Sequence, residues 1–203
     1  AGEIAGLNVR AIVNEPTAAA LFYATNQDVK GKVVVYDLGG GTFDVTVVDV
    51  YGKEIDIVSS YGDRHLGGVD FDNALLDMLN KRYKTKFGSN LIESDSDRRK
   101  HAGSIENLKK TLSKRAKGRI RLSGEAGQHT FDVTRSDFEE LISPVIAKSE
   151  MLVEMSLDEA SVEPADIDKV LLVGGSCRIP FVQERLQKIF GFAPSLEVNV
   201  DEC

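Results

Sequence analysis

The feature that most constrains this chain is a run of three glycines between two segments rich in β-branched residues. The full motif reads Asp37-Leu38-Gly39-Gly40-Gly41-Thr42-Phe43-Asp44. Glycine lets backbone N–H groups approach a ligand closely, as a phosphate-binding turn requires. Since Gly-Lys-Ser/Thr is absent and a strand follows, the motif is not a Walker A loop. It predicts a hairpin tip aimed at a polyphosphate, with an ordinary glycine turn flanked by surface acids as the alternative.

The polar residues around these glycines suit phosphate chemistry. If a phosphate lies on the glycines, Thr42 supplies a hydroxyl at the terminal phosphoryl group, and Asp37 and Asp44 hold Mg²⁺ through water. Glu15, in Asn14-Glu15-Pro16-Thr17, is a candidate to orient attacking water or a metal-bound water. Its plainer interpretation is a carboxylate at a helix N-terminus, where the helix dipole favours negative charge.

The hydrophobic pattern of the first third predicts strands around one helix. Val9–Val13 is a short strand candidate, and an alanine-rich helix is expected over Thr17–Tyr23. Lys32–Tyr36, Phe43–Val50 and Glu54–Ser60 are β-branched segments at close spacing, which predicts an antiparallel meander.

From Gly67 the apolar period changes to that of helices, which predicts a mixed α/β insert at 67–135. A first amphipathic helix is expected from the spacing of Phe71, Ala74, Leu75, Met78, Leu79 and Tyr83. A second is expected after a solvent-exposed charged linker, Glu93–Lys100, with Ala102, Ile105, Leu108, Leu112 and Ala116 on its apolar stripe. Two short strands, Arg119–Leu122 and Thr130–Val133, complete the insert.

After the insert the pattern returns to that of a layered α/β body. Ser136 with Glu139 forms a capping-box pattern that predicts a helix through Leu157, and Pro144 predicts a kink in it. A buried strand, a glycine turn and a final helix are then expected at residues 168–173, 174–175 and 179–190.

Three further polar features lie beside predicted helices. Gly174-Gly175-Ser176-Cys177-Arg178 lies between a strand and a helix, where a ligand can use the helix N-terminus. His65-Leu66-Gly67-Gly68 precedes the first insert helix, and His65 is expected to be structural. On the second insert helix, Glu106, Lys109 and Ser113 project within about 60° of one another. Each feature alone is explained as well by a turn or a solvated polar face.

Composition excludes several classes of protein. The chain has 203 residues, 42% of them hydrophobic, and a formal net charge of −7, which argues against a broad basic surface for nucleic acid or anionic membrane. Its apolar runs are of strand length, so no transmembrane segment is expected. Two cysteines without CxxC spacing, and no visible signal peptide, favour a cytoplasmic setting, with an organelle lumen as the alternative. The amino terminus looks internal.

The motifs together, in this order, resemble the heat-shock-protein-70 (DnaK) chaperone family from end to end. The stretches that carry the resemblance are Asn14–Ala20, Asp37–Val45, His65–Gly68, Phe71-Asp72 and Val173–Pro180. The resemblance implies the second half of the nucleotide-binding domain, an α/β lobe with an actin-like ATPase (ribonuclease-H-like) fold. It places the core at 1–66 and 136–203 and a nucleoside-clamping subdomain at 67–135.

The resemblance also implies roles for particular residues. Gly39, Gly40, Gly41 and Thr42 would hold the β- and γ-phosphates of ATP or ADP. The network of Mg²⁺, K⁺ and water would involve Glu15, Asp37, Thr42 and Asp44. The nucleoside would be held by Gly68, Glu106, Lys109, Lys110, Ser113, Gly174, Gly175, Ser176, Arg178 and Asp201. Departures from the family pattern are Lys110 for arginine, Val69 for glutamate, Cys177 for threonine and Val200 for proline.

The activity implied is hydrolysis of ATP to ADP and phosphate in a stress-response chaperone, coupled to binding and release of unfolded polypeptide by a domain outside this sequence. A J-domain co-chaperone and a nucleotide-exchange factor are the implied partners. The family's first lobe is not in this sequence, so the fragment is expected to fold, bind ATP weakly and hydrolyse it negligibly. The alternatives are an actin-fold sugar or acetate kinase and a non-hydrolysing regulatory homologue.

Overall fold

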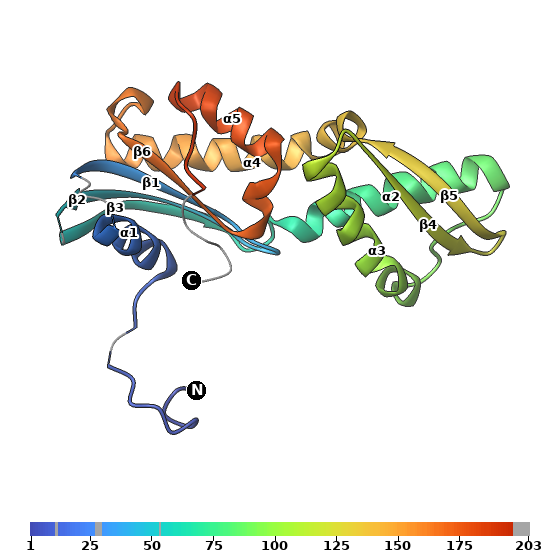
Figure 1. Cartoon of the computed structure of the whole chain (residues 1–203), viewed down its shortest axis with the longest axis horizontal. Helices are drawn as coiled ribbons and strands as arrows, with labels where there is room; N and C mark the ends of the chain where they lie inside the picture. Colours follow the sequence, from blue (N-terminus) through green and yellow to red (C-terminus); the bar gives the residue numbers. More distant parts are fainter. Residues whose placement is uncertain (11, 27–29, 53, 197–203) are drawn as a thin grey trace.

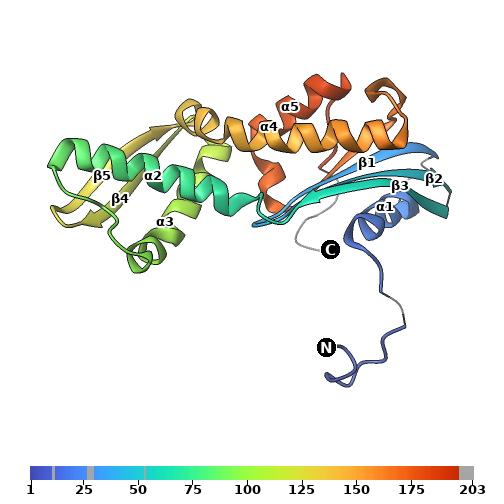
Figure 2. The same ribbon diagram turned by 180° about the vertical axis from the view of Figure 1, so that it is seen from behind.

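The chain forms an elongated molecule with two parts side by side along its long axis (Figures 1 and 2). The computed structural model describes residues 1–10, 12–26, 30–52 and 54–196. One part is built on a four-stranded sheet, here called the sheet part, and the other, the insert, on a two-stranded sheet. None of the helices within these ranges is long and apolar enough to cross a membrane.

The four-stranded sheet has the order β3-β2-β1-β6. β1 (Lys30–Leu38), β2 (Phe43–Tyr51) and β3 (Glu54–Asp63) are antiparallel neighbours, which confirms the predicted meander. β6 (Lys169–Val173) pairs in parallel with β1. The tip joining β1 to β2 and the carboxyl end of β6 therefore lie at the same edge of the sheet.

Helices cover both faces of this sheet. α1 (Glu15–Asn26) covers one face, and α4 (Arg135–Ala160) and α5 (Pro180–Phe190) cover the other (Figure 1). Since side chains alternate along a strand, β1 contributes to both apolar layers. Val33 and Val35 pack in the α1 layer, whereas Val34 and Tyr36 pack in the α4 layer.

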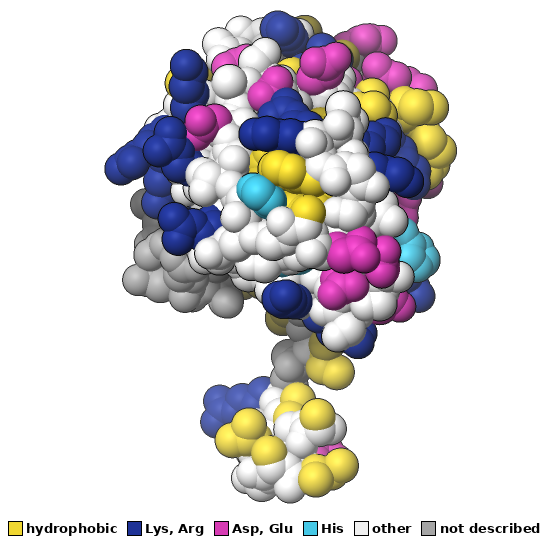
Figure 3. All heavy atoms as spheres, turned by 90° about the vertical axis from the view of Figure 1, so that its right-hand side faces the viewer, with side chains coloured by type: hydrophobic (Ala, Val, Ile, Leu, Met, Phe, Trp, Pro, Cys, Tyr) yellow, Lys and Arg dark blue, Asp and Glu magenta, His cyan; other side chains and the backbone are white. Residues whose placement is uncertain are grey.

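The insert packs two helices against its two-stranded sheet. α2 (Gly68–Phe87) and α3 (Asp95–Lys114) contact each other, and β4 (Lys117–Gly124) pairs antiparallel with β5 (Gly127–Thr134). Residues 67–135 hold 15 of the 25 lysines and arginines but only 9 of the 32 acids. Figure 3, which looks onto the insert end, shows dark blue groups spread over that face.

α4 contacts elements of both parts. It lies against β2, β3 and α5 of the sheet part and against α2, α3 and β5 of the insert. Two buried serines one heptad apart hold it on the sheet: Ser149 Oγ lies 2.7 Å from Tyr36 Oη, and Ser156 Oγ lies 2.7 Å from Ser59 Oγ. The helix continues through Pro144, and the kink expected there stays a prediction.

The predicted strand at Val9–Val13 is wrong. The described residues of this segment form no strand, and Val9 and Val13 are exposed. A strand needs a hydrogen-bonding neighbour, and this segment lies away from both edges of the sheet (Figure 1). The helix that follows begins earlier than expected, at Glu15.

The predicted helix starts also need correction. α3 begins at Asp95, within the stretch expected to be a linker, because Ser94 and Asp97 form a capping box there. α4 is capped by Thr134 with Asp137, two residues before the predicted pair Ser136 and Glu139. Aspartate at the third helical position replaces glutamate in both boxes, since its carboxylate also reaches the cap N–H.

The apolar stripe of α3 differs from the prediction at both ends. Ala102 and Ala116 are exposed, and His101 takes the first buried position beside Ile105. The imidazole Nε2 of His101 lies 3.1 Å from Ser123 O. Burial lowers the pKa of His101, which favours a neutral ring within the insert core.

Candidate functional site

The triglycine hairpin joins β1 to β2 and is closed by one short hydrogen bond. Gly39 N–H donates to Thr42 O at 3.0 Å. Gly40, Gly41 and Thr42 are exposed, and a Cβ added at Gly40 or Gly41 would meet no described atom within 4 Å. Neither of these two glycines has a positive φ. The fold itself therefore does not require glycine at positions 40 and 41, and open space lies over their backbone.

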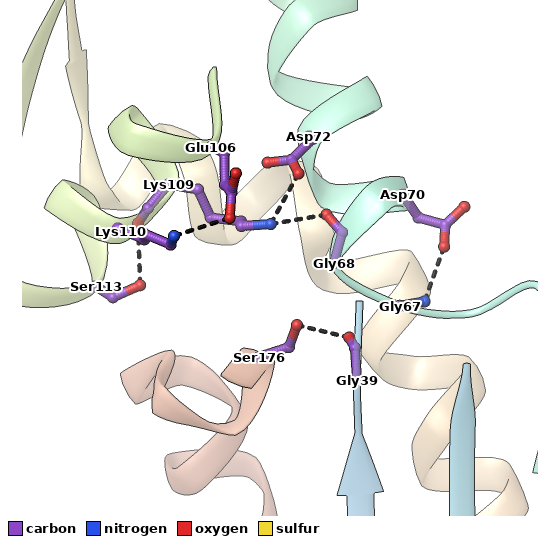
Figure 4. A network of polar contacts seen from close by, with 10 residues as sticks. All are labelled: Gly39, Gly67, Gly68, Asp70, Asp72, Glu106, Lys109, Lys110, Ser113 and Ser176. Carbon is purple, nitrogen blue, oxygen red and sulfur yellow. Dashed lines mark hydrogen bonds and ion pairs between the residues drawn. The ribbon is translucent and has the colours of Figure 1, made fainter. Parts of the chain in front are cut away.

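The hairpin is tied to the start of α2 and to the short helix η2 (Gly175–Arg178). Gly39 O accepts hydrogen bonds from Gly68 N–H at 3.0 Å and from Ser176 Oγ at 2.9 Å (Figure 4). Gly40 O accepts a further bond from Val69 N–H at 2.7 Å. Three segments far apart in the sequence therefore meet at one backbone turn.

Close backbone approach explains three of the four glycines in the other two pairs, Gly67, Gly68 and Gly174. A Cβ on Gly67 would lie 2.6 Å from Gly41 N, and one on Gly68 would lie 2.9 Å from Ser176 Oγ. Gly174 has φ +87°, and a Cβ there would lie 2.3 Å from Leu38 O. These positions need glycine to bring the hairpin, α2 and η2 together.

A cavity of about 380 Å³ opens beside the hairpin, between α3 and η2. Its lining residues are Gly40, Glu106, Lys109, Lys110, Ser113, Lys114, Gly175, Ser176, Arg178 and Ile179. The structure thus brings the α3 residues singled out in the sequence to the same cavity as the second glycine pair. Lys114 and Ile179 were missed, although Lys114 lies one helical turn beyond Lys110 on the same face.

The α3 side chains at this cavity are held by polar contacts (Figure 4). Lys109 Nζ donates to Asp72 Oδ2 at 2.8 Å and to Gly68 O at 3.0 Å. Lys110 Nζ lies 2.8 Å from Glu106 Oε1, four residues earlier. Ser113 Oγ donates to Lys109 O at 3.0 Å, so its lone pairs remain open to a ligand donor.

A second group of predicted residues lies around the base of the hairpin. Asp37 is half-buried at the end of β1, whereas Glu15, Thr42 and Asp44 are exposed. Burial, together with the negative charges of Glu15 and Asp44, raises the pKa of Asp37 to about 6. Three carboxylates therefore lie near one another, and among the described residues no cation lowers the pKa of Asp37.

The acids fit an indirectly held cation better than a directly bound one. Over the described ranges, no group of three or more His, Cys, Asp or Glu side chains is close enough to hold a metal ion. A hydrated Mg²⁺ keeps several waters and needs few protein oxygens, and its charge would favour the ionised form of Asp37. Gly174 borders this group, since a Cβ there would lie 2.8 Å from Asp37 Oδ1.

The remaining residues singled out in the sequence are Asp201, His65 and Cys177. Asp201 lies outside the described residues. His65 is exposed and its backbone N–H donates to Asp63 Oδ1 at 2.8 Å, while the structural role expected of its side chain stays a prediction. Cys177 is fully buried, and burial raises the pKa of its thiol, so it behaves as a core residue.

A larger hollow of about 680 Å³ lies elsewhere, between the end of α3 and the β4–β5 sheet. It is open, and its charged lining includes the exposed ion pair of Arg119 with Asp132. No glycine turn presents backbone N–H groups there. The cavity beside the triglycine hairpin is the better candidate because backbone donors, cations and hydroxyls converge on it.

The model of a known protein family, described as Hsp70 protein, matches residues 1–203. The match includes the triglycine hairpin, the cavity residues of α3 and η2, and the whole insert.

Proposed function

Because the chain belongs to the Hsp70 family, whose members are chaperone ATPases with an actin-like fold, we propose that it forms one wall of an ATP site. Within that wall, the triglycine hairpin binds the phosphates and the cavity between α3 and η2 binds the nucleoside. We further propose that residues 67–135 act as the nucleoside-clamping part and residues 1–66 and 136–203 as the core.

The phosphate half of the proposal rests on the backbone of the hairpin. Gly40 and Gly41 are exposed and have free space where a Cβ would be, so a phosphate can approach the backbone of the turn from that side. Thr42 adds a hydroxyl at the end of the turn. In this arrangement the terminal phosphoryl group lies nearest Thr42 and the acids.

The nucleoside half rests on the cavity lining. Lys109 and Arg178 offer hydrogen-bond donors and the Ser113 hydroxyl offers an acceptor, while the Lys110–Glu106 pair borders the opening. Lys110 carries a point charge rather than a flat guanidinium, so we expect it to contact the base edge or a hydroxyl and to stack poorly. Gly175 leaves space for the ligand, since a Cβ there would meet no described atom within 4 Å.

The acids provide the cation site in this proposal. Asp37 and Asp44 would hold Mg²⁺ through water, with K⁺ as a further candidate, and Glu15 would orient a water molecule. A bound Mg²⁺ neutralises phosphate charge and so favours in-line attack on the terminal phosphoryl group. The raised pKa of Asp37 supports this role, because a bound cation would offset the repulsion between its carboxylate and the two neighbouring ones.

The single observation that carries the proposal is that Gly40 of the hairpin lines the same cavity as Lys109 and Arg178. Phosphate and nucleoside contacts are therefore within reach of one ligand. For the intact protein we propose ATP hydrolysis coupled to binding and release of unfolded polypeptide, with a J-domain co-chaperone and an exchange factor as partners.

Titration of Mg·ATP and Mg·ADP into wild type and Thr42→Ala, with phosphate release measured in parallel, tests the proposal. We expect both nucleotides to bind and Thr42→Ala to weaken ATP more than ADP, since Thr42 faces the terminal phosphate. Thr130→Ala removes a similarly exposed hydroxyl from β5 and should change neither affinity. Failure of the wild type to bind either nucleotide at millimolar concentration would disprove the proposal.

A further inference from the structure

Lys109 differs from its neighbour Lys110 in how firmly it is held. The Lys109 side chain is 13% exposed and bonds to two residues of another helix, α2, whereas the Lys110 side chain is 63% exposed and pairs within its own helix. An exposed pair within one helix stabilises little and exchanges readily with water. Lys109 is therefore the α3 cation whose position is set by the fold.

The contacts of Lys109 leave one donor for a ligand. An ammonium group has three N–H donors. Two of them are committed, one to Asp72 Oδ2 at 2.8 Å and one to Gly68 O at 3.0 Å. Since Lys109 lines the cavity, the third N–H is left for a group bound there.

Asp72 is an unusual residue to find at this place. Its Oδ1 atom is buried and has no hydrogen-bond partner among the described residues. Burial raises the pKa of Asp72 and the Lys109 ammonium lowers it, with burial the larger influence. A half-satisfied carboxylate in this position weakens the fold, so its presence calls for a role other than stability.

The same contacts reach the phosphate hairpin. Lys109 bonds to Gly68 O, and the N–H of Gly68 bonds to Gly39 O, which also accepts from Ser176 Oγ (Figure 4). A continuous set of hydrogen bonds therefore joins Asp72 on α2, Lys109 on α3 and the triglycine turn. The lysine and the turn are held in one fixed relation before any ligand arrives.

We propose that Asp72 is a positioning residue for the nucleoside side of the site: it fixes the Lys109 ammonium so that its remaining N–H is directed at a bound nucleoside. The inference rests on the proposed nucleotide function. Without Asp72, Lys109 regains its rotamers and has to be immobilised on binding, which lowers nucleoside affinity. Asp72 itself does not touch the ligand, because its free oxygen is buried.

The test compares ADP with tripolyphosphate, which lacks a nucleoside, in wild type and Asp72→Asn, with binding followed by NMR. Ordering one long side chain corresponds to about a three- to tenfold loss of affinity. We expect that loss for ADP and no change for tripolyphosphate. Without ligand, the Lys109 ammonium signal, protected from exchange in the wild type, should be lost in Asp72→Asn and restored at least in part by Asp72→Glu.

A double variant separates positioning from a general structural role. If Asp72 acts through Lys109, Asp72→Asn with Lys109→Met binds ADP no more weakly than Lys109→Met alone. The matched control is Asp77→Asn, which removes another 2.8 Å ion pair between α2 and α3, with Arg98, away from the cavity. It should leave ADP binding at the wild-type level.

Two results would overturn the inference alone: ADP binding by Asp72→Asn equal to or tighter than wild type, or a double variant weaker than Lys109→Met. A wild type that binds no ADP would instead remove the proposed function, and this inference with it. The ammonium signal needs no nucleotide, so an unprotected Lys109 in the wild type contradicts the positioning role directly.

Discussion

Two of the antiparallel hairpins of the molecule, β1–β2 and β4–β5, both turn at glycines, but for different reasons. At the β4–β5 tip, Gly127 has φ +98°, and a Cβ on Gly124 would lie 2.8 Å from the Tyr83 ring. At the β1–β2 tip, Gly40 and Gly41 have neither a positive φ nor a neighbour that a Cβ would meet. The fold explains the first pair of glycines completely and the second pair not at all.

This difference shows how a functional glycine is recognised in a structure. A glycine that the backbone or the packing requires has a reason within the chain. A glycine in open space at the edge of a cavity is not explained by the fold. It is explained by a ligand that must approach the backbone closely. The predictions below test whether the glycines divide in this way.

The largest effect is expected at Gly174, a site glycine that the fold also requires. Gly174→Ala places a Cβ 2.3 Å from Leu38 O at a φ of +87°, so we expect the free energy of unfolding to fall by about 3 kcal/mol or more. Denaturant unfolding measures this. An unchanged unfolding midpoint would show that the glycines cannot be sorted by their contacts.

The next effect is expected in ligand binding at the β1–β2 tip. Gly40→Ala or Gly41→Ala fills the open space over the turn, so ADP affinity should fall by about tenfold, or 1.4 kcal/mol. The free energy of unfolding should change by less than about 0.5 kcal/mol. Calorimetry and thermal unfolding of the same samples check both values, and loss of stability without loss of binding would reverse the assignment.

At the β4–β5 tip we expect the opposite result. Gly127→Ala forces an L side chain to a φ of +98°, which should lower the free energy of unfolding by about 1 kcal/mol. ADP affinity should stay at the wild-type value, because the tip lies at the far end of the insert (Figure 1). A variant that binds ADP more weakly while remaining folded would break the contrast between the hairpins.

The smallest effect concerns the acid at the base of the β1–β2 tip. The pKa of Asp37 is raised to about 6, so between pH 4 and 6 the folded state binds more protons than the unfolded state. The wild type should therefore lose stability relative to Asp37→Asn as pH rises through that window. After allowance for partial exposure the change is about 1 kcal/mol or less. Parallel pH profiles that do not diverge would contradict it.

Much of the fold could be predicted because burial imposes a period on the sequence. The β-branched runs between 32 and 60 and the three- and four-residue spacing after Gly67 correspond to β1–β3 and α2. The first residues of the helices were harder to predict. In α4, for example, two cap patterns overlap, Thr134 with Asp137 and Ser136 with Glu139. Which one is used depends on where β5 ends, a tertiary fact.

For the candidate site, the sequence identified the segments better than their connections. Lys109 and Ser113 could be grouped because they share a helix face, and the cavity has both. Asp72 could not be found in this way, since it lies on a different helix from Lys109 and 37 residues away from it in the sequence. The bond from Gly68 N–H to Gly39 O has no side-chain signal at all, as it is made by backbone atoms.

α4 is a single helix of about 39 Å that contacts both the sheet part and the insert, so it connects the two parts mechanically. A tilt of α2 and α3 must be transmitted along it. Pro144 cannot donate to the carbonyl of Glu140, so bending is easiest at that point. Beyond it, Ser149 and Ser156 resist sliding over the sheet. We therefore expect the proline and the two serines to influence how α2 and α3 move relative to the sheet.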